Sequence, residues 1–204
     1  MLNILSLTAS PIKGSSTEIL LEEIVRGVRE NAGQECRAEL TRLNDLRYIP
    51  CQACGRSPEP EYCFYHDDLD AVYERLIKYD IILFGSPVYF DSVSAQAKMF
   101  IDRCNCLRPP DFEGKSGHHF KRIITRQRYG AMVLVGGERG EFECARKVVA
   151  GFFKWVEIIN SGAIFYAGSE WTKIGPVAGD RPKLDEAYKL GKILAAKAGS
   201  PEQI

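Results

Sequence analysis

One stretch of the chain decides the fold: Ile81-Ile82-Leu83-Phe84-Gly85-Ser86-Pro87-Val88-Tyr89-Phe90. It starts with a fully apolar run, which is typical of a strand buried on both faces of a parallel sheet. A segment with apolar residues at helical spacing follows at 95–103. Loops at the carboxyl ends of parallel strands are where α/β folds bind ligands, so we expect a binding site here. The aromatic residues Tyr89 and Phe90 after Pro87 suit a flat ring system.

Strands and helices alternate along the chain. Besides 80–85, the apolar patterns predict strands at 2–8, 35–43, 130–135 and 163–167. They predict helices at 17–31, 67–79, 94–107, 142–158 and 184–198. We therefore expect one domain over residues 1–204, an α/β, flavodoxin-like three-layer sandwich around a five-stranded parallel sheet of order 2-1-3-4-5. Two long irregular segments, at 46–66 and 108–128, are expected to be excursions from this domain.

The composition narrows the possible partners. The 204 residues carry 27 Lys and Arg and 27 Asp and Glu, so the formal net charge is zero and nothing attracts nucleic acid or an anionic membrane. No apolar run approaches the ~18 residues that span a bilayer, and the start of the chain lacks the basic region of a signal peptide. The seven cysteines are an odd number, which indicates thiols or ligands in a cytoplasmic protein rather than a disulfide framework.

The loop after the first strand is rich in hydroxyl groups and precedes a helix. A helix N-terminus offers unpaired N–H groups and a favourable dipole to an anion such as phosphate. The hydroxyls of Ser16 or Thr17 would also cap the helix without any ligand. The loop therefore predicts either an anion site or a capped turn, and its candidate residues are Ser10, Ile12, Lys13, Ser15, Ser16 and Thr17.

The loop after the fourth strand contains Gly136, Gly137 and Glu138. Glycines at this position let the backbone approach a ligand closely, although a tight turn between strand and helix needs glycine too. The loops after the first, third and fourth strands are expected to open on the same edge of the sheet. Their coincidence is a stronger indication of a ligand site than any one of them.

These segments together resemble the NADPH-dependent FMN reductase family and, within it, the iron-sulfur flavoprotein branch. The resemblance runs from Met1 to about Ala198 and is most specific over residues 86–103. It implies bound FMN, with Ser10, Ser15, Ser16 and Thr17 at the phosphate, Pro87, Val88, Tyr89 and Phe90 along the isoalloxazine, and Gly136, Gly137 and Glu138 at its other edge. The family commonly has arginine where this chain has Ile12, so neutralising the phosphate would fall to Lys13 or to backbone amides.

The segment from Cys51 to His66 departs from that resemblance. The iron-sulfur branch has four cysteines here as ligands of a [4Fe–4S] cluster, and this chain has Ser57 at the third position. Serine is a poor substitute where a cubane wants four thiolates. The alternatives are structural thiols, a defective cluster, a redox dithiol at Cys51 and Cys54, or a zinc site. The zinc site would use Cys51, Cys54, Cys63 and His66, an accepted Cys₃His set.

Several other residues carry weaker signals. Arg122, Arg126 and Arg128 suit either a solvated face or contact with the 2′-phosphate of NADPH. Cys36 and Cys144 are expected in or near the core.

The function predicted from these residues is that of an FMN-dependent NAD(P)H oxidoreductase. A nicotinamide would reduce bound FMN, which would pass electrons to a small acceptor such as a quinone or a free flavin. One alternative is an electron carrier that never meets a nicotinamide, and another is a flavin-less protein with a structural zinc loop. The family resemblance also implies a homodimer or homotetramer.

Overall fold

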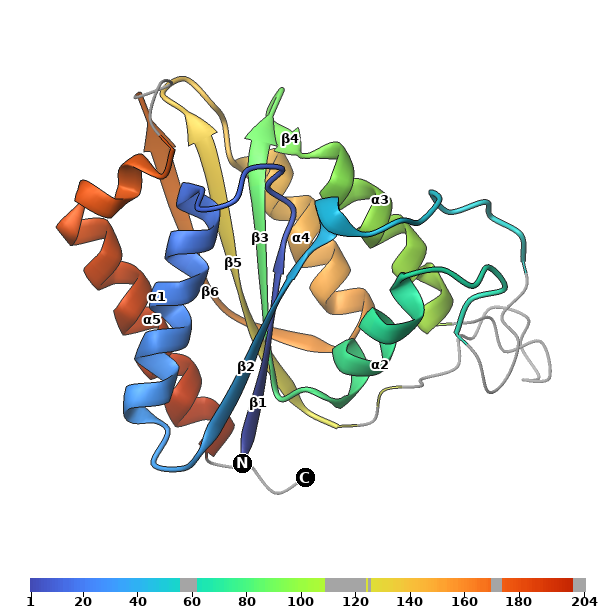
Figure 1. The fold of residues 1–204 in the computed structure, drawn as a ribbon, viewed down its shortest axis with the longest axis horizontal. Coiled ribbons are helices and arrows are strands. Elements are labelled where there is room, and N and C mark those ends of the chain that lie inside the picture. The colour runs from blue at the N-terminus through green and yellow to red at the C-terminus, as the bar shows by residue number, and fades with distance from the viewer. Residues whose placement is uncertain (56–61, 109–123, 125, 170–173, 200–204) are drawn as a thin grey trace.

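The computed structural model describes residues 1–55, 62–108, 124, 126–169 and 174–199. Its centre is a parallel sheet whose strands run in the order β2-β1-β3-β5-β6 (Figure 1). These strands are β1 (Leu2–Thr8), β2 (Cys36–Arg42), β3 (Ile81–Tyr89), β5 (Arg128–Gly137) and β6 (Ile158–Gly168). The parallel α/β architecture predicted from the sequence is thereby confirmed.

The prediction of five strands was incomplete, because the sheet has a sixth strand, β4 (Ser92–Val93). It pairs antiparallel with the end of β3, with Val88 opposite Val93. The segment Pro87–Tyr89, expected in a loop, therefore belongs to a strand that continues beyond Gly85 into a short hairpin. β6 is likewise longer than the predicted strand at 163–167.

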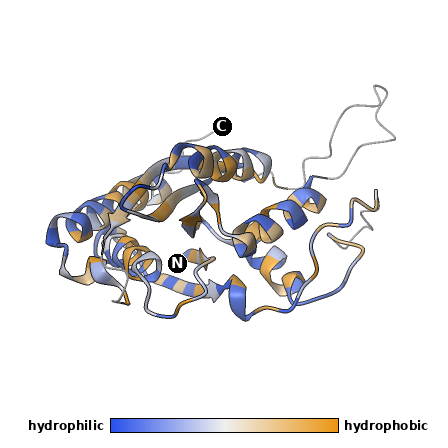
Figure 2. Ribbon diagram, turned by 90° about the horizontal axis from the view of Figure 1, so that it is seen from above, coloured by the Kyte–Doolittle hydropathy of each residue, from blue (hydrophilic) through white to orange (hydrophobic). Residues whose placement is uncertain are grey.

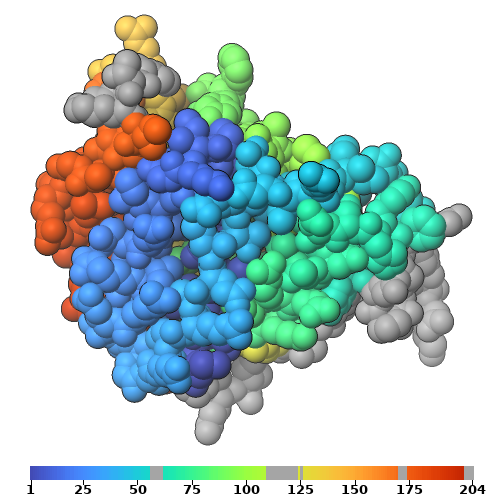
Figure 3. All heavy atoms as spheres, in the orientation of Figure 1, coloured from blue at the N-terminus to red at the C-terminus, as the bar shows by residue number. Residues whose placement is uncertain are grey.

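Helices cover both faces of the sheet, as Figures 1 and 2 show. They are α1 (Ser16–Asn31), α2 (Leu69–Lys78), α3 (Ala95–Arg103), α4 (Glu143–Trp155) and α5 (Arg181–Gly199), with short 3₁₀ turns η1 (Leu43–Asp45), η2 (Cys104–Leu107) and η3 (Pro176–Gly179). One apolar cluster joins the sheet to α1 and α5, and a larger one joins it to α2, α3 and α4. In the space-filling view α1, β2 and α2 form one face, with α5 at its side (Figure 3).

Serine side chains cap the first residues of two helices, α1 and α3. Ser15 caps α1 by accepting a hydrogen bond from the amide of Glu18, and Ser94 caps α3 by accepting one from Ala97. The chain leaves α1 through Gly33, whose φ of 64° is readily available to glycine. Within the described residues no helix is both long and apolar enough to cross a membrane.

The backbones of helices α1 and α5 pack closely at Gly27 and Gly191. A Cβ added at Gly27 would lie 2.2 Å from the carbonyl oxygen of Tyr188 and 3.1 Å from the Cα of Gly191. We expect Gly27→Ala to lower the free energy of unfolding by about 1–3 kcal/mol, because backbone rather than a flexible side chain must move. The control is Gly151→Ala in α4, which meets nothing within 4 Å and should stabilise the helix by roughly 0.5–1 kcal/mol. Denaturant unfolding measures the free energy of unfolding of both variants. Equal effects of the two substitutions would contradict the close packing of α1 against α5 at Gly27.

Candidate functional site

A pocket of about 680 Å³ opens at the carboxyl ends of β1, β3 and β5, at the top of Figure 1. All the cofactor residues predicted from the sequence line it except Lys13. The lining residues in that set are Ser10, Ile12, Ser15, Ser16, Thr17, Pro87, Val88, Tyr89, Phe90, Gly136, Gly137 and Glu138. Lys13 is directed elsewhere, since its ammonium lies 3.8 Å from Asp45 and is largely exposed.

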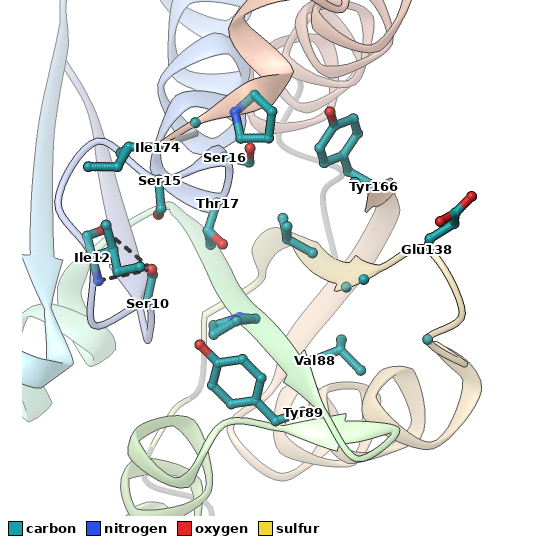
Figure 4. A pocket seen from close by; sticks show the side chains of 18 of the residues that line it. Ser10, Ile12, Ser15, Ser16, Thr17, Val88, Tyr89, Glu138, Tyr166 and Ile174 are labelled. Atoms are coloured by element: carbon teal, nitrogen blue, oxygen red, sulfur yellow. Dashed lines mark hydrogen bonds between the residues drawn. The ribbon is translucent and has the colours of Figure 1, made fainter. Parts of the chain in front are cut away.

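One end of the pocket is the loop that leads into α1. Figure 4 shows the hydroxyls of Ser10, Ser15 and Thr17 facing the same space. The Ser10 hydroxyl accepts a hydrogen bond of 3.3 Å from the amide of Ile12, which fixes the turn. The first amides of a helix have no partner within the helix, so this end can receive an anion through backbone N–H groups.

A buried carboxylate shapes the same loop. Glu18 is 2% exposed and accepts a hydrogen bond of 2.9 Å from the amide of Gly14. Arg42 of β2 donates to both of its carboxylate oxygens, at 2.8 and 3.0 Å. These hydrogen bonds with Glu18 raise the pKa of Arg42. Because the pair is neutral overall, Glu18 stabilises the loop without opposing an anion at the helix N-terminus.

The side wall of the pocket is the hairpin formed by β3 and β4. Its two turn residues, Phe90 and Asp91, have φ values of 51° and 60°, the left-handed region that favours glycine. The carboxylate of Asp91 accepts a hydrogen bond of 3.0 Å from the amide of Glu141 on the neighbouring loop. At its base, Ser94 donates to the carbonyl of Ala9 after β1. The hairpin is therefore tied to both adjacent loops.

The pocket is also lined by residues that sequence reasoning missed: Val135, Arg139 and Gly140 at and after the end of β5, Tyr166 and Gly168 of β6, and Ile174, Gly175 and Pro176. A Cβ at Gly175 would lie 2.6 Å from the carbonyl oxygen of Gly14, so glycine allows the segment 174–176 to approach the loop before α1. The φ of 62° at Gly175 also favours glycine. The available signal was a glycine-proline pair soon after the last strand, which is typical of a turn.

The pocket fits FMN in size and chemistry. Its volume is within the roughly 300–1,000 Å³ of small-molecule sites. A helix N-terminus offers amides for a phosphate, and apolar side chains with Tyr89 and Tyr166 offer surfaces for a flat ring. Gly136 and Gly137 expose backbone at the end of β5, where N–H groups can face polar atoms of that ring.

The described residues that were proposed as metal ligands are not arranged as a metal site. In the part of the chain that the structure describes, no three His, Cys, Asp or Glu side chains lie together as metal ligands. Cys63 is buried and accepts a hydrogen bond of 3.4 Å from the guanidinium of Arg103, while the imidazole of His66 lies 3.0 Å from Asp70. Ser57 lies outside the described residues. With three thiols rather than four in the motif, this arrangement does not fit a [4Fe–4S] cluster.

The cysteines differ strongly in their surroundings. Cys104 is fully buried, and burial raises its pKa well above the usual value. Burial likewise raises the pKa of Cys106 to about 12. Cys54 and Cys144 are exposed and Cys36 is half-buried, so the expectation of a core position was wrong for Cys144.

These surroundings predict the order of alkylation. At about pH 8, where an ordinary thiol is partly ionised, iodoacetamide should label Cys54 and Cys144 and leave Cys104 and Cys106 unlabelled. Peptide mass spectrometry before and after unfolding gives the comparison. Rapid labelling of Cys104 in the folded protein would contradict its burial.

Two of the three arginines considered for NADPH, Arg126 and Arg128, lie at the amino ends of the strands, opposite the pocket. Arg128 begins β5, at the opposite end of that strand from the pocket, and donates to the carbonyls of Leu76 and Val156. It is fully buried, which lowers its pKa to about 10. Arg126 pairs with Asp80 just before β3. Contact with NADPH was therefore the wrong interpretation for Arg126 and Arg128, and the burial of Arg128 also excludes a solvated face for that residue. Arg122 lies outside the described residues.

Known proteins with similar sequences point to flavin chemistry. An iron-sulfur flavoprotein of Methanocaldococcus jannaschii is 30% identical over 95% of this chain and 96% of its own length. A Bacillus subtilis protein, provisionally named an NAD(P)H-dependent FMN-containing oxidoreductase, is 25% identical over 88% of this chain and 91% of its own.

Solved structures resemble the fold at lower identity. An NADH:FMN oxidoreductase matches with a TM-score of 0.64 at 14% identity, over 99% of this chain and 92% of its own. A flavodoxin from the domain Archaea matches with a TM-score of 0.56 at 14% identity, over 98% of this chain and 100% of its own. These likenesses establish the flavodoxin-like fold. The profile of one family matches residues 2–173, and by this match the chain belongs to the NADPH-dependent FMN reductase family.

Proposed function

We propose that this protein binds FMN in the pocket and uses NAD(P)H to reduce it, passing the electrons to a small acceptor such as a quinone or a free flavin. The observation that carries the proposal is the convergence of the predicted loops on one pocket with a helix N-terminus at one end and aromatic side chains beside it. Bound FMN would supply hydride acceptance and electron transfer. The protein binds and orients the reacting rings.

Within that proposal each part of the pocket has a task. The amides at the start of α1, with the hydroxyls of Ser10, Ser15 and Thr17, hold the phosphate. Pro87, Val88 and Tyr89 lie along the ring, and the backbone at Gly136 and Gly137 donates to its polar edge. Thr17 also packs close to β3, since a Cβ at Gly85 would lie 2.6 Å from its methyl group. No side chain is assigned as a general acid or base.

The test is oxidation of NADPH and of NADH by FMN-loaded protein, with and without a quinone. We expect loss of the visible flavin absorbance when nicotinamide is added anaerobically, and continued turnover once the quinone is supplied. The iron-sulfur flavoproteins among the relatives give weight to the electron-carrier alternative. Reduction by a protein donor, without any nicotinamide oxidation, would favour that carrier.

For the cysteine loop we propose a structural role without an iron-sulfur cluster. The supporting observations are that buried Cys63 accepts a hydrogen bond from Arg103, and that no three potential metal ligands lie together among the described residues. Elemental analysis of anaerobically purified protein should find no stoichiometric iron. Iron at about four per chain would contradict this, and one zinc per chain would favour the Cys₃His site.

We further propose a single domain over residues 1–204 that forms a homodimer or homotetramer, in keeping with the family. The segments at 46–66 and 108–128 are candidates for the contact between copies. Sedimentation equilibrium tests the association, and a monomer across the concentration range would end this part of the proposal.

A further inference from the structure

We infer that Arg139 binds a phosphate group of the nicotinamide dinucleotide at the mouth of the pocket. The inference rests on the proposed function and adds a residue for its second substrate. Arg139 lies on the loop between β5 and α4 and is exposed to solvent. Among the described residues that line the pocket it is the only basic side chain.

The guanidinium of Arg139 is available for an anion. Among the residues that the structure places, it makes no ion pair or side-chain hydrogen bond. The next arginine along the chain is a contrast, because Arg146 donates to both carboxylate oxygens of Glu143, at 2.7 and 2.8 Å. Glu138 adjoins Arg139 in sequence, yet Figure 4 shows its carboxylate directed away from the centre of the pocket.

Among the residues that the structure describes, the other cationic side chains considered for this role are already paired or lie far from the pocket. Lys13 lies by Asp45, and Arg42 is bound to Glu18 on both carboxylate oxygens. Arg126 and Arg128 are at the opposite edge of the sheet. The helix N-terminus of α1 is assigned to the phosphate of FMN. Of the described residues that line the pocket, Arg139 is therefore the one that offers a positive charge to a second phosphorylated ligand. A guanidinium pairs with phosphate oxygens in a two-pronged geometry.

An aromatic side chain is held at the same mouth. Phe90 is 102% exposed, although its backbone adopts the costly left-handed conformation. The bond from Glu141 to Asp91 joins the Phe90 turn to the loop that carries Arg139. A planar ring and a phosphate are the two recognisable parts of a nicotinamide nucleotide, so this pair of loops suits such a ligand.

Binding of the oxidised nucleotides to FMN-loaded protein tests the assignment without turnover. Titration calorimetry gives Kd for NADP⁺ and NAD⁺ with wild type, Arg139→Ala and Arg139→Lys. We expect Arg139→Ala to raise Kd by about 10- to 100-fold, the usual worth of a charged hydrogen bond, and Arg139→Lys to restore part of it. The control is Arg29→Ala, an exposed arginine at the end of α1 that does not line the pocket.

The comparison of Kd changes for NADP⁺ and NAD⁺ shows which phosphate of the dinucleotide Arg139 contacts. A loss for NADP⁺ alone assigns Arg139 to the 2′-phosphate, and equal losses for both nucleotides assign it to the pyrophosphate. Unchanged Kd for both, or a wild type that binds neither, overturns the inference. FMN affinity is measured in parallel and should not change. If wild type binds NADP⁺ through Arg139 but NADPH does not reduce the flavin, the proposed function fails and this inference stands.

Discussion

Replacing Arg103 with methionine is expected to lower the free energy of unfolding by about 3–5 kcal/mol, the cost of removing one partner of a buried ion pair. Arg103 is 1% exposed and donates at 2.7 Å to both the carboxylate of Asp67 and the carbonyl of Ile49. It also donates to the carbonyl of Tyr65 at 3.2 Å and to the thiol of Cys63. The side chain thus joins Ile49 and residues 63–67 to the end of α3, and methionine would leave these acceptors unsatisfied.

Denaturant unfolding of wild type and Arg103→Met measures this loss. The control is Arg146→Met, because the side chain of Arg146 is 40% exposed and pairs with the exposed Glu143 on its own helix, so its removal should change stability by no more than about 0.5 kcal/mol. Far-UV circular dichroism shows whether the variant folds before the comparison is made. A loss below about 1 kcal/mol in a folded variant would contradict the role of Arg103 as the centre of this network.

Ser15→Asp is expected to reduce FMN affinity by on the order of 100-fold or more, while the protein stays folded. Aspartate caps a helix as well as serine does, and its charge is favourable at a helix N-terminus. The same charge would face the phosphate of FMN, and two like charges about 4 Å apart repel by roughly 4 kcal/mol at an effective dielectric constant of about 20. Ser15 lines the pocket, and its hydroxyl accepts from the amide of Glu18.

The matched control is Ser15→Asn, which has the shape and capping ability of aspartate without its charge. Fluorescence titration gives Kd for FMN and for riboflavin with both variants. The asparagine variant should bind FMN much more tightly than the aspartate variant, and riboflavin should bind both alike. Equal FMN affinity in the two variants would place the phosphate elsewhere.

The sequence predicted the layers of the fold because its apolar runs and helical spacings are local patterns. It missed the continuation of β3 past Gly85, since Gly-Ser-Pro is typical of a loop. The strand continues because Pro87 lies opposite Val135 of β5 and the chain returns as β4. Pairing of this kind depends on residues distant in sequence. The start of β6 was missed because Asn160 and Ser161 are polar, which a strand at the edge of a sheet allows.

Some features of the candidate site could likewise be predicted from the sequence, and others could not. The rule that ligands lie beyond the carboxyl ends of parallel strands brought together three loops far apart in the chain. The same rule would have excluded Arg128, had the start of β5 been located at that residue. Arg139 was passed over because an arginine in a glycine-rich loop has no distinctive spacing. The hydrogen bonds from Arg42 to Glu18 and from Glu141 to Asp91 join residues far apart in the sequence, so only the folded structure shows them.

Titration of flavin-free protein with FMN tests the central claim most directly, with riboflavin as the comparison. The account predicts saturation at one FMN per chain and riboflavin binding weaker by at least about 10-fold, because riboflavin lacks the phosphate that the start of α1 receives. A chain that takes up neither flavin, or that binds riboflavin as tightly as FMN, would contradict it.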